Sequence, residues 1–293
     1  MSKGPGAPVL AGVDGSVSAL DAVAWAADEC SRHRTPLRLV HAYLPSMPSR
    51  IGTGDVSRHI DDAVQAQGRR WLRRARAEAR LVAPDITITS RLACTGSVPL
   101  LVDESQSARL VVLGSRGLGG FGELLVGSTA SALVSHGKCP VVVVRRTTAV
   151  DGPVVVGVDG SPVSEAAVAF AFEAASIRGA SLTAVMSSRD FLLDRGYHDT
   201  KIAHDWSEVE DDERRLLAQR LAGWQEKYPD VRVDRVVGRE RAARMLMRLG
   251  EQARLLVVGS HGLGGFTGML LGSTATTLVQ HAPCPLAVVR PQS

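Results

Sequence analysis

Two glycine-rich stretches of the chain have the residue types and spacing of a phosphate-binding loop. Each follows an apolar run typical of a strand and leads into a segment with helical periodicity. Glycines let a backbone approach a ligand closely, and the N–H groups at a helix N-terminus can donate to phosphate oxygens. Both stretches fit the pattern G-x2-G-x9-G-S-T, and its fixed positions are Gly114, Gly117, Gly127, Ser128 and Thr129 in the first copy and Gly259, Gly262, Gly272, Ser273 and Thr274 in the second.

Two other nucleotide-binding patterns fit these stretches less well. The Walker sequence G-x4-G-K-[ST] requires a lysine, which both loops lack. The dinucleotide pattern G-x-G-x-x-G occurs once, from Gly117 to Gly122, but it follows the fourth expected strand rather than the first, and Thr267 breaks it in the second copy. The other loop residues expected to contact a nucleotide are Ser115, Arg116, Leu118, Gly119 and Gly120 in the first copy and Ser260, His261, Leu263, Gly264 and Gly265 in the second.

The two loops belong to a longer internal repeat. The sequence Val-Asp-Gly-Ser at Asp14 recurs at Asp159, an offset of 145 residues (159 − 14 = 145), and Gly114 recurs at Gly259 with the same offset (259 − 114 = 145). A constant offset over the whole unit indicates duplication of a complete domain. We therefore expect two domains, residues 1–148 and 149–293, joined by small and polar residues.

Each half alternates strand-like and helix-like segments, which predicts an α/β fold. Apolar runs without alternation, such as 141–144, indicate parallel strands covered by helices on both faces. Ligands of such sheets bind beyond the carboxyl ends of the strands, where Asp14 and Gly114 are expected to lie. Strands are expected at 9–13, 37–42, 86–92, 110–113 and 141–145 and at 154–158, 181–186, 231–237, 255–258 and 286–290, and helices at 18–33, 58–82, 98–106 and 128–136 and at 163–178, 206–227, 240–251 and 273–281.

These features together resemble the universal stress protein family, in its tandem, ATP-binding form. The resemblance rests on Val-Asp-Gly-Ser after the first strand, on the two complete loop patterns, and on the His-x-x-Cys-Pro sequences that begin at His136 and His281. It covers nearly the whole chain after the N-terminal residues 1–8. It implies two tandem open parallel sheets of five strands, each in the order 3-2-1-4-5 with helices on both faces, and ATP at the point where the strand order reverses.

The resemblance also implies roles for individual residues. Asp14 and Asp159 would lie beside the adenosine, while the glycines and the Ser-Thr pair of each loop would hold the phosphates. The implied cofactor is ATP, alone or with magnesium. The resemblance also implies pairing through the last strand of each unit, both between the two halves of one chain and between the chains of a homodimer. The remaining residues expected at the nucleotide are Gly12, Gly157, His41 and Met186, the last two through backbone atoms at the adenine edge.

Several of these residues have a purely structural alternative. The loop glycines could only shape a turn, Asp14 could cap a helix, and Ser128 and Ser273 could cap their helices instead of donating to phosphate. His41 is expected to be a packed residue at a strand end rather than a chemical group. Two further histidines, His136 and His281, are expected at helix C-termini, where a cation is tolerated.

The loops offer few groups for phosphoryl transfer. Such chemistry needs charge neutralisation and a positioned nucleophile, and the sequence shows neither a loop lysine nor paired carboxylates. We therefore expect an ATP-binding regulator of stress or growth, with unidentified protein partners and at most weak ATP hydrolysis. A slow ATPase is one alternative, and a protein-binding scaffold that works without nucleotide is another.

Composition limits the remaining possibilities. The 293 residues are 45% hydrophobic and carry a formal charge of +4, and no apolar run approaches the ~20 residues of a membrane helix. Residues 1–8 lack the apolar core of a signal peptide, so we expect a cytoplasmic protein without a membrane partner. The four cysteines and eight histidines show no metal-binding spacing, which predicts structural thiols and no metal site.

The densest positive charge lies in residues 69–76. Helical periodicity predicts a buried face made of Val64, Trp71, Ala75, Ala79 and Val82, with the arginines pointing outward. The expected interpretation is a solvated helix face, which argues against nucleic acid as a partner. Contact with RNA or with phospholipid is the alternative.

The two loops differ at one charged position, which leads to a testable difference between them. Arg116 corresponds to His261, so the first site would carry a fixed charge and the second a titrating one where these side chains reach the phosphates. We expect the second site to retain nucleotide less well as the pH rises from about 6 to about 8, because a neutral imidazole does not attract phosphate. Equilibrium dialysis over this range measures the occupancy of each site, and equal, pH-independent occupancies would contradict the expectation.

Overall fold

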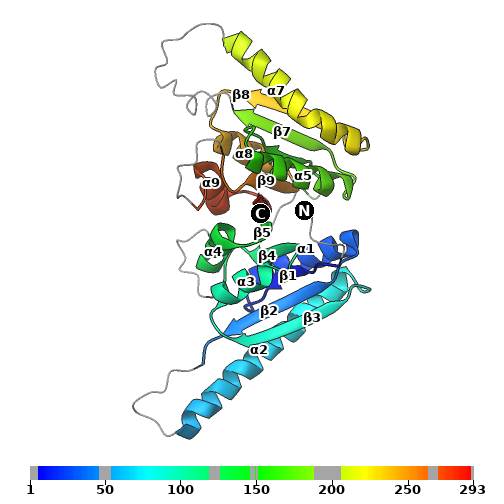
Figure 1. Cartoon of the computed structure of the whole chain (residues 1–293). Helices are drawn as coiled ribbons and strands as arrows, with labels where there is room; N and C mark the ends of the chain where they lie inside the picture. Colours follow the sequence, from blue (N-terminus) through cyan, green and yellow to red (C-terminus); the bar gives the residue numbers. More distant parts are fainter. Residues whose placement is uncertain are drawn as a thin grey trace. The chain divides into compact units, whose positions relative to one another are not determined.

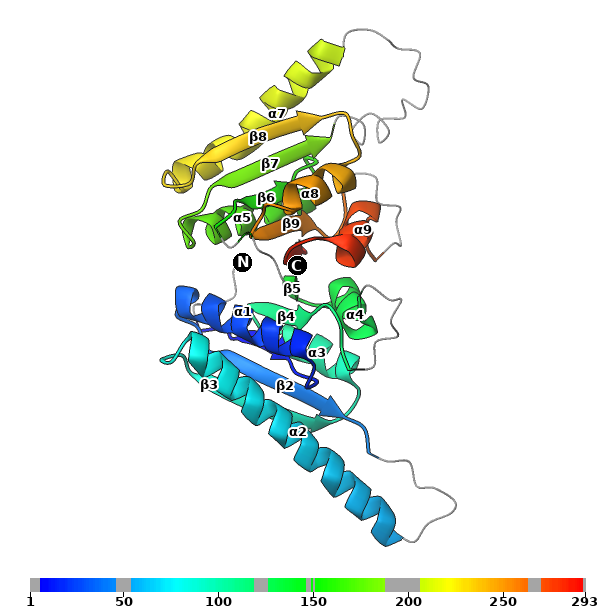
Figure 2. The ribbon, with the colours of Figure 1, turned by 180° about the vertical axis from the view of Figure 1, so that it is seen from behind.

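The computed structural model describes residues 6–45, 54–118, 126–145, 149, 151–187, 206–262 and 270–291, and the structural statements below refer to these ranges. Residue contacts divide the chain into two units, Met1–Val144 and Arg145–Ser293. This division lies just before the junction expected from the sequence. Figures 1 and 2 show the elements of each unit from opposite sides.

Unit 1 alternates strands and helices in the predicted order. Its strands pair in parallel in the order β3-β2-β1-β4-β5. The elements are β1 (Val9–Gly12), α1 (Val17–His33), β2 (Leu37–Tyr43), α2 (Gly54–Val82), β3 (Ile88–Cys94), α3 (Ser97–Ser105), β4 (Leu110–Gly114), α4 (Ser128–His136) and β5 (Val141–Val144).

Unit 2 repeats this arrangement, in the order β8-β7-β6-β9-β10 with parallel pairing. The predicted α/β class and the 3-2-1-4-5 order of each unit are therefore confirmed. The elements are β6 (Val154–Gly157), α5 (Pro162–Ser176), β7 (Leu182–Ser187), α7 (Trp206–Lys227), β8 (Val233–Gly238), α8 (Ala242–Gly250), β9 (Leu255–Gly259), α9 (Ser273–His281) and β10 (Leu286–Val289).

Helices cover both faces of the strands in each unit. In unit 1, α1 packs beside α2 and α3 packs beside α4, and α5 with α7 and α8 with α9 repeat the pairs in unit 2 (Figure 1). Residues 141–144 of β5 and 286–289 of β10 are buried along their whole length, as the lack of alternation predicts. Within the described ranges, none of the helices is both long and apolar enough to cross a bilayer.

The first helix of each unit starts at a capping serine. The Oγ atom of Ser16 accepts a hydrogen bond from the backbone N–H of Ala19 at 3.1 Å, and Ser161 does the same for Ser164 at 3.1 Å. Such a bond satisfies one of the N–H groups that a helix start leaves without a partner. The caps fix where the chain turns from β1 into α1 and from β6 into α5, which is where the two aspartates lie.

The buried face of α2 differs in part from the prediction. Ala75 and Ala79 are fully buried, but Val82 is 43% exposed, and Leu72 is buried in its place. The buried residues follow the helical spacing 68, 72, 75, 79 and 83, so the face is rotated slightly from the one predicted. The arginines Arg69, Arg70, Arg73 and Arg74 are exposed, as expected.

Three of the four thiols belong to the core. Cys30, Cys139 and Cys284 are buried, whereas Cys94 is exposed at the end of β3, and all four are free thiols. Burial in apolar surroundings disfavours a thiolate. It raises the pKa of Cys30 and of Cys284 to about 12.

We expect an aromatic disulfide reagent to modify Cys94 alone in the native protein at neutral pH. The other thiols are shielded, and the high pKa values of Cys30 and Cys284 keep those two protonated. Release of the chromophore would show one fast equivalent per chain, and the remaining thiols would react only after unfolding in guanidinium. Cys94→Ser serves as the control and should remove the fast phase, and a fast phase that persists in this variant would contradict the assignment.

Candidate functional site

The carboxylate of Asp14 joins the end of β1 to the glycine loop after β4. Its Oδ1 atom accepts a hydrogen bond from the backbone N–H of Ser16 at 2.9 Å, and its Oδ2 atom accepts one from the backbone N–H of Leu118 at 3.1 Å. Ser16, not Asp14, is the cap of α1. The capping alternative for Asp14 is therefore wrong, and the residue instead ties two segments that lie 104 positions apart in the chain.

The loop after β4 runs close to the Asp14 turn and to the start of α1, and glycine stands at both positions where a Cβ atom would collide with them. A Cβ atom at Gly117 would lie 2.5 Å from Oδ2 of Asp14, and one at Gly114 would lie 2.6 Å from the backbone carbon and oxygen of Ser18. The backbone N–H of Arg116 also donates to the Ser18 hydroxyl at 3.4 Å. These glycines make a close approach, which goes beyond shaping a turn. Ser18 was missed from the sequence, because its role depends on a residue of a distant strand end.

A glycine, and not a serine, caps the helix after each loop. Gly127 is the N-cap of α4 and Gly272 is the N-cap of α9, and neither helix start has a side-chain capping bond. Ser128 and Ser273 are the first helical residues and are exposed. The alternative in which these serines cap their helices is therefore wrong. Their hydroxyls lie at helix starts, where the helix dipole favours an anion.

The second loop repeats most of this geometry. Oδ1 of Asp159 accepts from the backbone N–H of Ser161 at 2.9 Å, and a Cβ atom at Gly262 would collide with Oδ2 of Asp159. The backbone N–H of Gly272 donates to the carbonyl of Ser260 at 2.8 Å, as Gly127 does to Ser115 at 2.9 Å. The expected contacts Gly119, Gly120, Leu263, Gly264 and Gly265 lie outside the described residues.

Two side chains next to the second loop differ from those of the first. Val163 stands where unit 1 has Ser18, and a Cβ atom at Gly259 would lie 2.9 Å from Cγ1 of Val163. The second loop therefore has no counterpart of the Ser18 hydroxyl, which in unit 1 accepts from the backbone N–H of Arg116. His261 is half-buried, and its Nδ1 atom lies 3.1 Å from the hydroxyl of Ser260, whereas Arg116 is exposed. The two sites therefore share a backbone frame and differ in side-chain chemistry.

The side chain of His41 packs behind the site, as expected. Its Nδ1 atom donates to the carbonyl of Val13 at 2.6 Å, and its ring meets the ring of Trp71 edge-on with centroids 5.1 Å apart. Trp71, on α2, also covers Gly15, which has the positive φ of +88° that favours glycine. Helix α2 thereby braces the turn that holds Asp14. Met186, at the same place in unit 2, is buried as well.

Gly12 and Gly157 were expected at the nucleotide, but the structure surrounds them with core side chains. A Cβ atom at Gly12 would lie 2.5 Å from Cδ2 of Leu113, and one at Gly157 would lie 3.1 Å from Cδ1 of Leu246. The space that these glycines leave is thus filled by packing. His136 and His281 are the last residues of α4 and α9, which confirms their expected places at helix C-termini.

Comparisons with known proteins agree with this architecture. The model of the universal stress protein family matches residues 7–145 and 152–290. A universal stress protein of Mycolicibacterium smegmatis is 41% identical over 291 residues, which cover 97% of each chain, and one of Mycobacterium tuberculosis strain H37Rv is 39% identical over 297 residues, 96% of each chain. The crystal structure of a universal stress protein from Archaeoglobus fulgidus matches over 98% of both chains with a TM-score of 0.70 and 15% identity, which supports the fold.

Replacing Trp71 should loosen the Asp14 turn. Trp71→Leu introduces the residue found at the equivalent position of unit 2, Leu216, and removes the indole that covers Gly15. We expect backbone amide exchange in residues 14–18 to become roughly tenfold faster, the factor for a local opening made about 1.4 kcal/mol easier. Hydrogen–deuterium exchange mass spectrometry measures this effect, and the Asp159 turn of the same molecule is the control. Equal changes in both turns, or none, would contradict the bracing role.

Proposed function

Because the chain belongs to the universal stress protein family, we propose that each of its two units binds ATP and that the bound nucleotide regulates a stress or growth response. The observation that carries this proposal is the contact between the glycine loop and the aspartate, at Gly117 with Asp14 and at Gly262 with Asp159. A Cβ atom at either glycine would have to displace the carboxylate, so glycine lets the loop lie against it. The loop is also hydrogen-bonded to the start of the following helix, through the backbone N–H of Gly127 in unit 1 and of Gly272 in unit 2.

The loop and the helix start supply donors suited to a triphosphate. Gly127 caps α4 without a side chain, and Ser128 and Thr129 begin the helix behind it. Backbone N–H groups at a helix start bind phosphate oxygens, and the dipole adds roughly half a positive charge. Arg116 is exposed in the same loop and can add a full charge. The proposed phosphate site of unit 1 therefore combines backbone donors with one cationic side chain.

The aspartate suits a sugar that donates hydrogen bonds. An ionised carboxylate has about four lone-pair positions, and Asp14 uses one on each oxygen for Ser16 and Leu118. Positions on both oxygens are therefore available to ribose hydroxyls. The adenine would then lie toward the end of β2, against backbone atoms near His41, whose side chain is packed away. Asp14, whose Oδ2 atom accepts from Leu118 of the loop, would also be a carboxylate available to a magnesium ion that accompanies the phosphates.

Hydrolysis is the weaker alternative for this site. Phosphoryl transfer requires a cation at the transferring group and a residue that positions the attacking water. Neither loop contains a lysine, and the loop segments contain a single acidic residue, Glu123, which lies outside the described residues. We therefore propose a nucleotide holder whose bound state alters conformation or partner choice. A cytoplasmic location, homodimer formation and protein partners are parts of the same proposal.

Substituting one loop glycine at a time should remove one nucleotide at a time. We expect the wild-type protein to bind one adenine nucleotide per unit, and Gly117→Val to weaken only the first site, by roughly a hundredfold, because valine displaces Asp14 at a cost of about 3 kcal/mol. Gly262→Val should affect only the second site. Isothermal titration calorimetry with ATP and nucleotide extraction from the purified protein measure both occupancies.

A matched control separates local from general effects of the valine. A Cβ atom at Gly223, on α7, has nothing within 4 Å, so Gly223→Val should bind like the wild type. Purified protein that carries no adenine nucleotide and shows no heat with ATP would sink the proposal. ATP turnover that persists unchanged in Asp14→Ala would point to a contaminant and not to this chain.

A further inference from the structure

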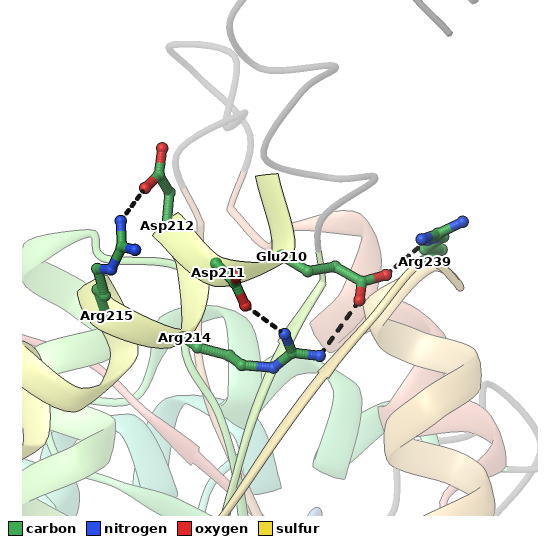
Figure 3. Close-up of polar contacts among 6 residues, drawn as sticks. All are labelled: Glu210, Asp211, Asp212, Arg214, Arg215 and Arg239. Atoms are coloured by element: carbon green, nitrogen blue, oxygen red, sulfur yellow. Dashed lines mark hydrogen bonds and ion pairs between the residues drawn. The ribbon is translucent and has the colours of Figure 1, made fainter. Parts of the chain in front are cut away.

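The long helices α2 and α7 occupy equivalent places in the two units and differ in how their arginines are neutralised. Arg69 and Arg70 correspond to Arg214 and Arg215 at the offset of the repeat (214 − 69 = 145). In α7 these arginines form ion pairs with acids of their own helix. Figure 3 shows these pairs. Arg214 pairs with Glu210 at 3.2 Å and with Asp211 at 2.7 Å. Arg215 pairs with Asp212 at 2.9 Å, and Glu210 also binds Arg239 at 2.6 Å.

In α2 the same positions carry neutral residues. Gln65, Ala66 and Gln67 stand where α7 has Glu210, Asp211 and Asp212. Arg69 donates to Oε1 of Gln65 at 3.1 Å, and Nε of Arg70 donates to Oε1 of Gln67 at 3.2 Å. The amides keep the arginines ordered in the way that the carboxylates of α7 do, but they leave the positive charge in place. Helix α2 thus presents arginines that are held by hydrogen bonds and are still fully charged.

The charge continues along the rest of the helix. We call Arg69, Arg70, Arg73, Arg74, Arg76 and Arg80 the arginine face of α2. Arg76 donates to the hydroxyl of Ser90 at 3.2 Å and Arg80 to the carbonyl of Pro84, both neutral groups. Within the described part of the chain, none of these six guanidinium groups has a carboxylate within ion-pair distance. Glu78 is the single acid between residues 68 and 82.

An exposed leucine continues the arginine face at its C-terminal end. Leu81 is 81% exposed, and the helical spacing places it on the side of Arg70 and Arg74. Among the described residues, the large hydrophobic side chains that are exposed are all aliphatic, and Trp71 of α2 is packed against Gly15. Single-stranded nucleic acid is usually held by aromatic side chains that stack on its bases, so this surface lacks that element. Arginines beside an exposed leucine instead suit the headgroup and acyl regions of a membrane surface.

We propose that the arginine face of α2 binds the surface of an anionic lipid bilayer. The arginines contact lipid phosphates, Leu81 enters the boundary with the acyl chains, and α2 remains packed on its strands. The residues of this surface belong to α2, whereas the glycine loops follow β4 and β9. Phospholipid contact therefore explains the arginines of α2 better than a solvated helix face does.

Sedimentation with sucrose-loaded vesicles tests the proposal on the full chain. We expect binding to an equimolar mixture of phosphatidylcholine and phosphatidylglycerol, no binding to phosphatidylcholine alone, and a steep loss between about 0.05 M and 0.5 M salt. The double variant Arg69→Gln/Arg70→Gln should lower the partition coefficient by at least about tenfold. Leu81→Gln should weaken binding by a similar factor at each salt concentration where binding is measurable, because it removes an apolar contact that salt does not screen.

The duplicated helix provides the matched control. Arg214→Gln/Arg215→Gln removes the same charge at the equivalent positions of α7, and it should leave vesicle binding within about twofold of the wild type, because those arginines are already paired. Equal losses in the two double variants would overturn the proposal, since they would show a response to net charge only. Binding to duplex RNA that depends on Arg69 and Arg70, without binding to vesicles, would also overturn it and assign the face to nucleic acid. Thermal melts establish that each variant is folded.

Discussion

The shared use of Asp14 by two distant segments is the constraint on which the rest of the site depends. Its two carboxylate oxygens accept from Ser16 and from Leu118, so the start of α1 and the loop after β4 are fixed to the same group. A Cβ atom at Gly117 would lie 2.5 Å from Oδ2, so glycine lets the loop lie against the carboxylate without displacing it. This contact sets the direction in which the chain approaches α4. The fold therefore creates the proposed phosphate site by placing β1 and β4 side by side.

Much of this arrangement could be predicted from the sequence because it is local or repeated. The apolar run at Val141–Val144 shows a strand buried on both faces, and the offset between Asp14 and Asp159 shows that one unit occurs twice. Parallel strands put their carboxyl ends at one edge of a sheet, so Asp14 and Gly114 had to meet once β1 and β4 were neighbours. The strand order itself came from the family resemblance, since composition and periodicity do not specify it.

What sequence reasoning missed depends on contacts between distant segments. Trp71 looked like one core residue of α2, but its indole covers Gly15 and meets the ring of His41. Ser18 looked like an ordinary residue in the first turn of α1, and it accepts from the backbone of Arg116. In the same way, Val82 was assigned to the buried face from periodicity alone. A rotation of the helix by a fraction of a turn buries Leu72 instead, and only packing against the strands decides that angle.

The duplication makes the two units internal controls for each other, and their differences have a direction. Backbone features are retained in both, such as the serine caps, the aspartates and the close approach of Gly117 and Gly262. Charges and polar side chains differ at equivalent positions of the two units. Ser18 corresponds to Val163, Arg116 to His261 and Gln65 to Glu210. A backbone frame is costly to alter, because each of its glycines and caps fits a specific neighbour. Side chains outside this frame change at less cost in stability, so one frame can support two sites and two surfaces of different chemistry.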